Sequence, residues 1–172
     1  GIQATRDSIR KKEFVILVEG YMDFLKLYQS SIENVLATSG TAFNKKHVIS
    51  LNRISKKVIL LYDGDDAGGK AVLKAGWTLL KGGLEPLVVR PPDGLDPDDW
   101  IEKVGKRNVL KQISKPQTYI NFNIDFNKGK LLEGADKKVY VTYLAKETKN
   151  IEDWIIRNDM VKIISEKLSI EE

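Results

Sequence analysis

Short runs of consecutive apolar residues alternate with longer segments of helical periodicity along the first hundred residues of the chain. The apolar runs predict buried strands at 14–18, 34–37, 58–62 and 85–90. Between and after them, apolar residues recur every three or four positions and predict helices at 21–29, 44–54, 70–80 and 98–104. Alternating strands and helices are typical of βα units. We therefore expect an α/β fold with a mostly parallel sheet of about four strands, flanked by helices.

The pattern changes near residue 107, after which no further strand is predicted. Helical periodicity continues at 108–114, 116–127, 135–148 and 151–168. We therefore expect two parts, an α/β domain over residues 1–107 and a small all-helical subdomain over residues 108–172. Residues 1–13 of the first part have the pattern of the tail of a truncated preceding helix.

Composition limits the classes of protein that fit this pattern. The 172 residues are 42% hydrophobic and 30% charged, which is enough to build a core and a water-exposed surface. There is no cysteine and only one histidine, so neither a disulfide framework nor a zinc site is expected. No apolar run approaches the ~20 residues of a membrane span, and no signal peptide pattern is present, so a cytoplasmic location is predicted.

The net charge of +4 and the isoelectric point near 9.1 are compatible with nucleic-acid binding. A lysine-rich, solvated surface explains the same charge. Charge alone therefore does not decide whether the chain contacts nucleic acid.

Acidic residues follow three of the predicted strands. The acids are Glu19, Asp23, Asp63, Asp65, Asp66, Asp96, Asp98 and Asp99. Parallel strands end at one edge of a sheet, and open α/β sheets bind their ligands at that edge. The sequence therefore predicts one acidic site there. Since turns and helix caps also use such residues, each segment alone has a purely structural explanation, and the prediction depends on their combination.

Carboxylates without nearby histidine or cysteine favour a hard cation, Mg²⁺ or Mn²⁺. Such ions assist phosphoryl or nucleotidyl transfer. Asp63 and Asp65 are separated by one glycine, so both can project the same way from an extended loop. Glu19 is a candidate for the general base, or for a further metal ligand.

Three further residues are candidates for contacts with phosphate or nucleic acid. Gly40 and Thr41 precede a predicted helix and can offer backbone donors, although a tight turn explains them equally well. Lys70 lies near the start of the helix after the Asp63–Asp66 loop, and a solvated helix lysine is the simpler explanation. Met22 is expected to pack in the core between its helix and the sheet.

Four sequence motifs resemble those of a known family. They are EGYMD at 19–23, ATSGTA at 37–42, YDGDDAG at 62–68 and PDGLDPD at 92–98. Together they resemble the Toprim domain, a catalytic fold shared by bacterial primases, topoisomerases and some nucleases. The finer match is to bacterial DnaG-type primases. Thr38 and Ser39 depart from the primase form of the second motif.

The resemblance implies synthesis of short RNA primers on single-stranded DNA from ribonucleoside triphosphates, assisted by Mg²⁺ or Mn²⁺. It implies that Asp63, Asp65 and Asp98 are metal ligands and that Glu19 is a catalytic base or an additional ligand. Asp63 and Asp65 are thereby also catalytic residues. The further acids of the primase motifs, Asp23 and Asp96, would support them.

The resemblance also implies partners. These are the single-stranded DNA template, ribonucleoside triphosphates and the RNA primer, with the replicative helicase and the single-strand-binding protein contacted through the full-length protein. Primases of this family have a zinc-binding module, which a chain without cysteine lacks. We therefore expect a fragment of the primase core, monomeric and with little or no activity alone. A Toprim nuclease and a non-catalytic interaction module are the alternatives.

Overall fold

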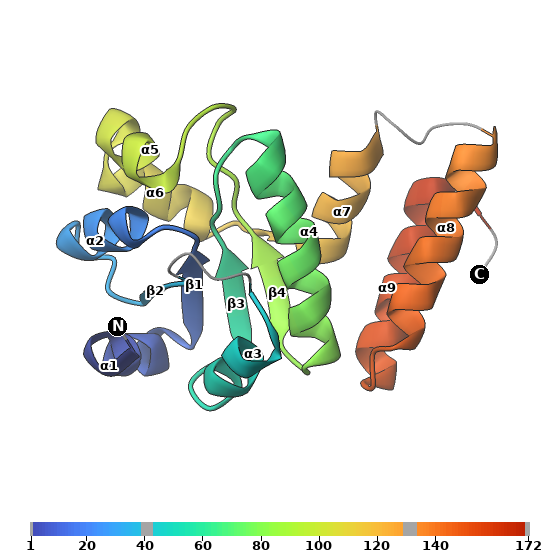
Figure 1. Cartoon of the computed structure of the whole chain (residues 1–172), viewed down its shortest axis with the longest axis horizontal. Helices are drawn as coiled ribbons and strands as arrows, with labels where there is room; N and C mark the ends of the chain where they lie inside the picture. Colours follow the sequence, from blue (N-terminus) through green and yellow to red (C-terminus); the bar gives the residue numbers. More distant parts are fainter. Residues whose placement is uncertain (1, 39–42, 129–133, 171–172) are drawn as a thin grey trace. The chain divides into compact units, whose positions relative to one another are not determined.

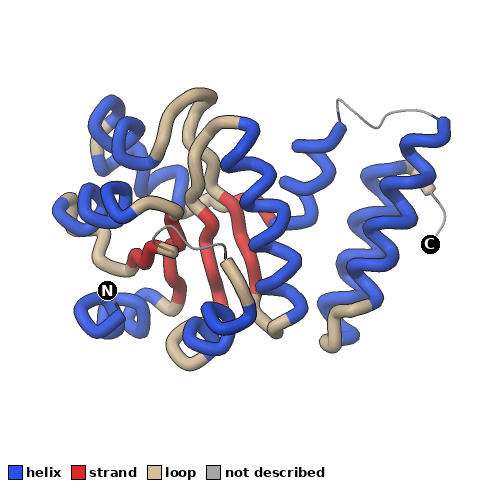
Figure 2. The backbone as a smooth tube through the Cα atoms, viewed as in Figure 1, coloured by secondary structure: helices blue, strands red, loops and turns tan. Residues whose placement is uncertain are grey.

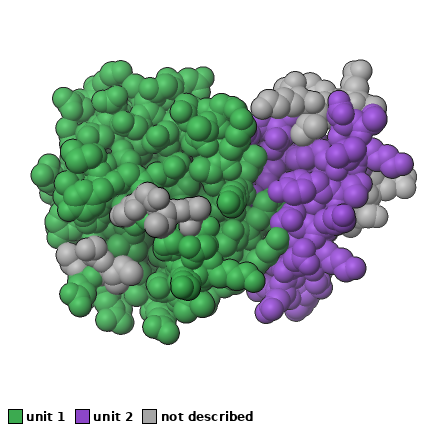
Figure 3. Space-filling model, viewed as in Figure 1, with its two compact units in different colours: residues 1–117 green, residues 118–172 purple. Residues whose placement is uncertain are grey.

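The computed structural model describes residues 2–38, 43–128 and 134–170. The chain forms two compact units, residues 1–117 and residues 118–172 (Figure 3). Each unit has its own set of buried apolar side chains, and the two are described separately below.

The described residues form a five-stranded sheet in the order β2-β1-β3-β4-β5, of which β1 to β4 belong to unit 1 (Figure 2). The strands are β1 (Phe14–Val18), β2 (Val35–Ala37), β3 (Lys57–Leu60), β4 (Glu85–Val88) and β5 (Gln117–Thr118). β1 pairs in parallel with β2 and with β3, and β3 pairs in parallel with β4. The predicted α/β fold is confirmed. The fifth strand was not predicted, because two residues are too few to leave a periodic pattern.

In the described part of unit 1, six helices surround this sheet. They are α1 (Ile2–Lys12), α2 (Tyr21–Gln29), α3 (Lys45–Asn52), α4 (Asp66–Lys81), α5 (Pro97–Val104) and α6 (Lys106–Ile113). In the view of Figure 1, α4 lies in front of β4. On one face of the sheet, α2, α5 and α6 contribute Phe24, Trp100 and Val109 to a common core cluster. Helix α4 begins at Asp66, four residues before the predicted start, because the side chain of Asp65 caps it.

The end of unit 1 differs from the predicted boundary at residue 107. The division falls after Gln117, because Val109 and Ile113 of α6 are buried in the same core cluster as Trp100 and Ile101 of α5. Helix α6 therefore packs on the sheet domain, although its sequence resembles the helices that follow it.

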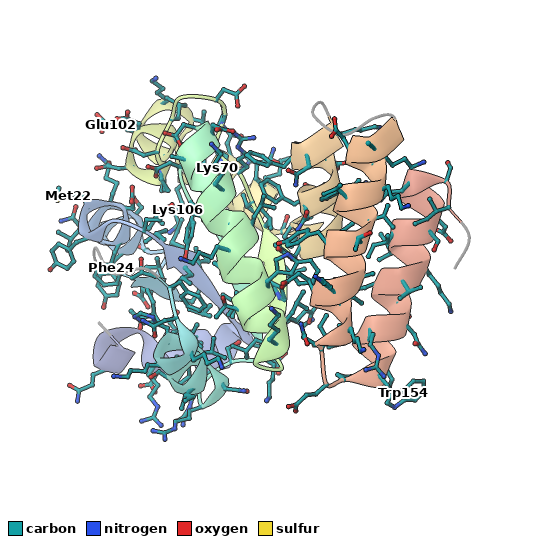
Figure 4. All side chains as sticks on the ribbon, turned by 45° about the vertical axis from the view of Figure 1, so that its right-hand side comes forward. Met22, Phe24, Lys70, Glu102, Lys106 and Trp154 are labelled. Atoms are coloured by element: carbon teal, nitrogen blue, oxygen red, sulfur yellow. The ribbon has the colours of Figure 1, made fainter. Side chains whose placement is uncertain are left out.

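Met22 was expected in the core, and this expectation is wrong. Its side chain is 64% exposed, because α2 buries Asp23, Phe24 and Leu27 instead. In Figure 4, Met22 and Phe24 lie on α2 with Met22 at the outer surface.

Unit 2 is helical, as predicted, with α7 (Tyr119–Asn127), α8 (Gly134–Lys149) and α9 (Trp154–Leu168). A buried network connects two of its helices. Tyr140 donates a hydrogen bond to Oδ1 of Asn123 at 2.7 Å, and Asn123 donates to the hydroxyl of Tyr119 at 3.0 Å. Of the helices within the described residues, none has the length and apolar character that crossing a membrane requires.

Candidate active site

The predicted acidic residues lie after the carboxyl ends of three parallel strands. Glu19 directly follows β1, Asp63 lies three residues after β3, and Asp96 ends the long loop that follows β4. Because β1, β3 and β4 are parallel neighbours, these three connections leave the sheet at the same edge (Figure 1). The topology therefore brings together acids that are far apart in the sequence.

Glu19 is half-buried, as are Asp63 and Asp96. Its Oε1 atom is buried and has no hydrogen-bond partner in the part of the chain that the structure describes. The pKa of Glu19 is raised from 4.5 to about 7, first by burial and then by the negative charges of Asp63, Asp65 and Asp23. A carboxylate in this position lacks a compensating positive charge.

Asp23 lies in the first turn of α2, and its side chain is 7% exposed. It accepts hydrogen bonds from the backbone N–H groups of Gly20 at 3.1 Å and Asp98 at 3.4 Å. Burial raises its pKa from 3.8 to about 6, the bond from Gly20 opposes that rise, and the charges of Asp63 and Asp96 add to it. A Cβ atom on Gly20 would lie 2.7 Å from Oδ2 of Asp23, so any other residue there would require the Asp23 carboxylate to shift.

The loop from Asp63 to Asp65 is held tightly in place. A Cβ atom on Gly64 would lie 2.2 Å from the carbonyl oxygen of Pro92, which explains the glycine between the two acids. Asp65 accepts a hydrogen bond from the N–H of Gly68 at 2.7 Å and thereby caps α4. Burial, followed by the charges of Asp96 and Asp65, raises the pKa of Asp63.

The two acids of the DPD sequence differ in their surroundings. Asp96 caps α5 by accepting a hydrogen bond from Asp99 N–H at 2.7 Å, and its charge raises the pKa values of Asp63 and Asp23. The carboxylate of Asp98 instead lies 3.3 Å from Nζ of Lys26. Asp96, predicted as a supporting acid, therefore stands with the other acids, while the predicted ligand Asp98 is engaged by a lysine.

The remaining candidates do not join this group. Lys70 forms an ion pair with Asp66 at 2.6 Å, one helical turn before it, and its side chain is 64% exposed (Figure 4). Gly40 and Thr41 lie outside the described residues. The neighbouring Thr38 donates a hydrogen bond to the carbonyl oxygen of Glu19 at 3.3 Å.

Two basic residues that organise the site were not among the predicted site residues. Arg90 donates hydrogen bonds to the carbonyl oxygens of Gly64 and Asp65, and so ties the end of β4 to the acidic loop. Lys26 pairs with Asp98 and, at 2.7 Å, with Glu102. Lys26 follows Asp23 by three residues on a predicted helix, so the two side chains lie on the same face of that helix. This spacing was the only feature of the sequence that could have placed Lys26 near the acidic site.

The donor set fits a hard divalent cation by its chemistry. Carboxylate oxygens are the ligands that Mg²⁺ and Mn²⁺ prefer, and the unpartnered Oε1 of Glu19 together with the raised pKa values shows an excess of negative charge. Among the described residues, no three acidic or histidine side chains stand close enough to hold a metal ion as they are. Ligation would require these side chains to turn toward a common point.

Comparison with known proteins identifies similar chains. Residues 16–101 match the family model described as Toprim-like. A DNA primase of Staphylococcus epidermidis is 31% identical over 169 residues, which are 96% of this chain and 28% of that protein. The chain thus spans about a quarter of the length of this relative.

Solved structures agree with this match. The structure of the zinc-binding and RNA polymerase domains of the Aquifex aeolicus primase has a TM-score of 0.82 and 32% identity, covering 98% of this chain and 40% of that one. A DnaG primase catalytic domain bound to single-stranded DNA has a TM-score of 0.85 and 27% identity, covering 99% of this chain and 55% of that one.

Proposed function

The chain belongs to the Toprim-like family, and from this membership we propose that it forms part of the catalytic core of a bacterial DNA primase. In this proposal, the complete protein joins ribonucleoside triphosphates into short RNA primers on a single-stranded DNA template and releases pyrophosphate. The observation that carries the proposal is the group of carboxylates at one sheet edge, which raise one another's pKa values around the unpartnered Oε1 of Glu19. The primase relatives favour primer synthesis over a nuclease or a non-catalytic module.

The acids have distinct proposed roles. Asp63, Asp65 and Asp98 would hold Mg²⁺ or Mn²⁺, and Glu19 is either a further ligand or the general base. When bound, the divalent ions supply positive charge that stabilises the negative charge developing during nucleotidyl transfer. Asp23 and Asp96 increase the negative charge around Asp63 and thereby strengthen the attraction for a cation.

The raised pKa of Glu19, about 7, suits a group that exchanges protons near neutral pH. In its ionised form, Glu19 can accept the proton of the primer 3′-hydroxyl as this oxygen attacks the incoming triphosphate. The surroundings of Glu19 are suited to this role because burial and neighbouring acids increase its basicity.

Binding of Mn²⁺ to this chain, measured by calorimetry, tests the metal site. We expect Glu19→Gln and Asp63→Asn each to weaken binding by roughly tenfold or more, because each removes a carboxylate from the group. Asp93→Asn is the matched control. This acid lies in the same loop region, but its side chain is 95% exposed and pairs with Arg90 at 3.6 Å, so binding should not change. Unchanged affinity in both site variants would refute the proposal.

A second experiment tests the reaction in the complete protein. Asp63→Asn should abolish primer synthesis from ribonucleoside triphosphates on single-stranded DNA. If the complete protein instead nicks DNA in the presence of Mg²⁺ or Mn²⁺ and makes no primer, the nuclease alternative is correct. If Asp63→Asn leaves primer synthesis intact, the acids have no catalytic role.

A further inference from the structure

The surface of α5 and α6 carries an uncompensated group of positive charges. Its members, which we call the α5–α6 basic surface, are the exposed side chains of Lys103, Lys106, Arg107, Lys111 and Lys115. From Lys103 to Ile124 the sequence contains no acidic residue. Within residues 2–38, 43–128 and 134–170, none of these five side chains forms a hydrogen bond or an ion pair.

Several other cations of unit 1 have acidic partners. Lys70 pairs with Asp66, and Lys57 lies 3.9 Å from Glu85. Even on α5, Glu102 is engaged by Lys26 from α2 and does not offset the charges that follow it. The positive charge of the α5–α6 basic surface is therefore available to a partner outside the chain.

The cations at the start of α6 oppose the stability of that helix. Arg107 and Lys111 lie one turn apart, where two like charges destabilise a helix by about 0.2–0.5 kcal/mol. Lys106 and Arg107 stand in the first turn, where the helix dipole favours negative charge, and Gly105 provides no side-chain cap. Lys103 and Lys111 lie in the last turns of their helices, where the helix dipole favours positive charge. Lys106 and Arg107 bring α6 no such gain, and their presence points to a role in binding.

The backbone beneath these charges is firmly held. Val109 and Ile113 are 0% and 4% exposed, so α6 is anchored in the core of unit 1 on its opposite side. Helices α5 and α6 lie side by side (Figure 1). The cations are consequently presented on a rigid support and not on a free tail.

The position of this surface connects it to the acidic site. Helix α5 begins directly after Asp96, whose charge acts on Asp63 and Asp23, and Lys103 lies in its last turn. Lys103 follows Asp96 by seven residues, which correspond to about 10 Å along α5. The α5–α6 basic surface therefore begins within one short helix of the acidic site.

We propose that the α5–α6 basic surface binds the phosphate backbone of the single-stranded nucleic acid that reaches the acidic site. This inference rests on the proposed function, because it takes the partner from the reaction assigned to that site. A single strand carries one negative charge per nucleotide, and a succession of unpaired lysines and arginines matches such a polymer. Binding releases counterions from the strand, so it must weaken steeply with salt.

The test is a fluorescence-anisotropy titration of a labelled oligothymidine with this chain, in EDTA and at several NaCl concentrations. The variant replaces Lys106, Arg107 and Lys111 together by glutamine. Because each phosphate contact on a single strand contributes about −0.7 to the slope of log K against log salt, we expect the slope to become less steep by about 2. A fourfold rise in salt should weaken the binding of the parent chain by a factor roughly twentyfold larger than that of the variant, because the variant lacks three such contacts.

The matched control replaces three exposed cations of the α3 segment, Lys45, Lys46 and Arg53, by glutamine. It removes the same charge and should retain the steep slope. The α6 variant must unfold at the same or a higher urea concentration than the parent chain, because its substitutions remove repulsion from an exposed face.

Three results would overturn the proposal. The first is that both triple variants lose the same affinity for the oligothymidine. The second is that neither variant loses affinity. The third is that the chain binds polyglutamate as it binds the oligothymidine. Mn²⁺ binding by the α6 variant separates this proposal from the proposed function. A chain that binds no Mn²⁺ but shows the expected salt slope would refute the metal site and leave the basic surface intact.

Discussion

Glu19→Gln should make the metal-free chain more stable near neutral and alkaline pH, although it removes a central acid of the site. The folded state raises the pKa of Glu19 from 4.5 to about 7, so the folded protein binds a proton more tightly than the unfolded chain does. The stability of the parent chain therefore falls as the pH rises from about 4.5 to about 7 and levels off above that. Glutamine does not ionise and escapes this loss.

The expected size follows from the two pKa values. A rise from 4.5 to about 7 corresponds to roughly 3 kcal/mol of unfavourable free energy for the ionised form. Because Glu19 is only half-buried, solvent screens part of this interaction, and we expect about 1.5 kcal/mol. The variant should thus gain about 1.5 kcal/mol near pH 8 and about nothing near pH 4, where both states of the parent chain are protonated.

Urea-induced unfolding followed by circular dichroism, with EDTA at both pH values, measures this difference. The difference in unfolding free energy between variant and parent isolates the contribution of Glu19. Asp23 and Asp63, whose pKa values are also raised, are present in both chains. Glu102→Gln is the opposite control, because Lys26 lowers the pKa of Glu102 and its removal should bring no gain at high pH. If Glu19→Gln changes the unfolding free energy by the same amount at both pH values, the surroundings of Glu19 do not disfavour its ionised form. That result would refute the reasoning.

Three further outcomes are expected. Gly64→Ala should destabilise the chain by roughly 2 kcal/mol or more, because the new Cβ would lie 2.2 Å from a backbone oxygen. Gly94→Ala is the control: its Cβ would lie in open space, and its φ of 79° should cost about 1 kcal/mol. Equal losses of stability in urea unfolding would contradict this expectation. Lys26→Met should tighten Mn²⁺ binding several-fold in calorimetry by releasing Asp98, and unchanged affinity would remove Asp98 from the proposed ligands. A chain of residues 1–117 should unfold cooperatively in urea on its own. A chain of residues 1–107 should be less stable by about 4 kcal/mol, or unfolded, because it lacks the buried side chains of Val109 and Ile113.

The sequence by itself determined the βα alternation and the location of the acids. Five apolar residues before Glu19 can only form a buried strand in this context, and a parallel sheet places the end of every such strand at one edge. The meeting of Glu19 with Asp63 is therefore a consequence of topology and could be predicted. The cap of α4 by Asp65 is equally local, since it joins residues three positions apart.

Only the tertiary structure decided the surroundings of the two acids of the DPD sequence. The direction of Asp96 and Asp98 depends on how α5 docks against α2, where Lys26 engages Asp98. The same holds for Met22, whose exposure follows from the face that α2 turns to the sheet, and for α6, which two buried residues assign to unit 1. Strand periodicity is a property of neighbouring residues, whereas helix docking is set by contacts between segments that are distant in the chain. For that reason, the position of the acidic site was predictable from the sequence, and the pairing of its side chains was not.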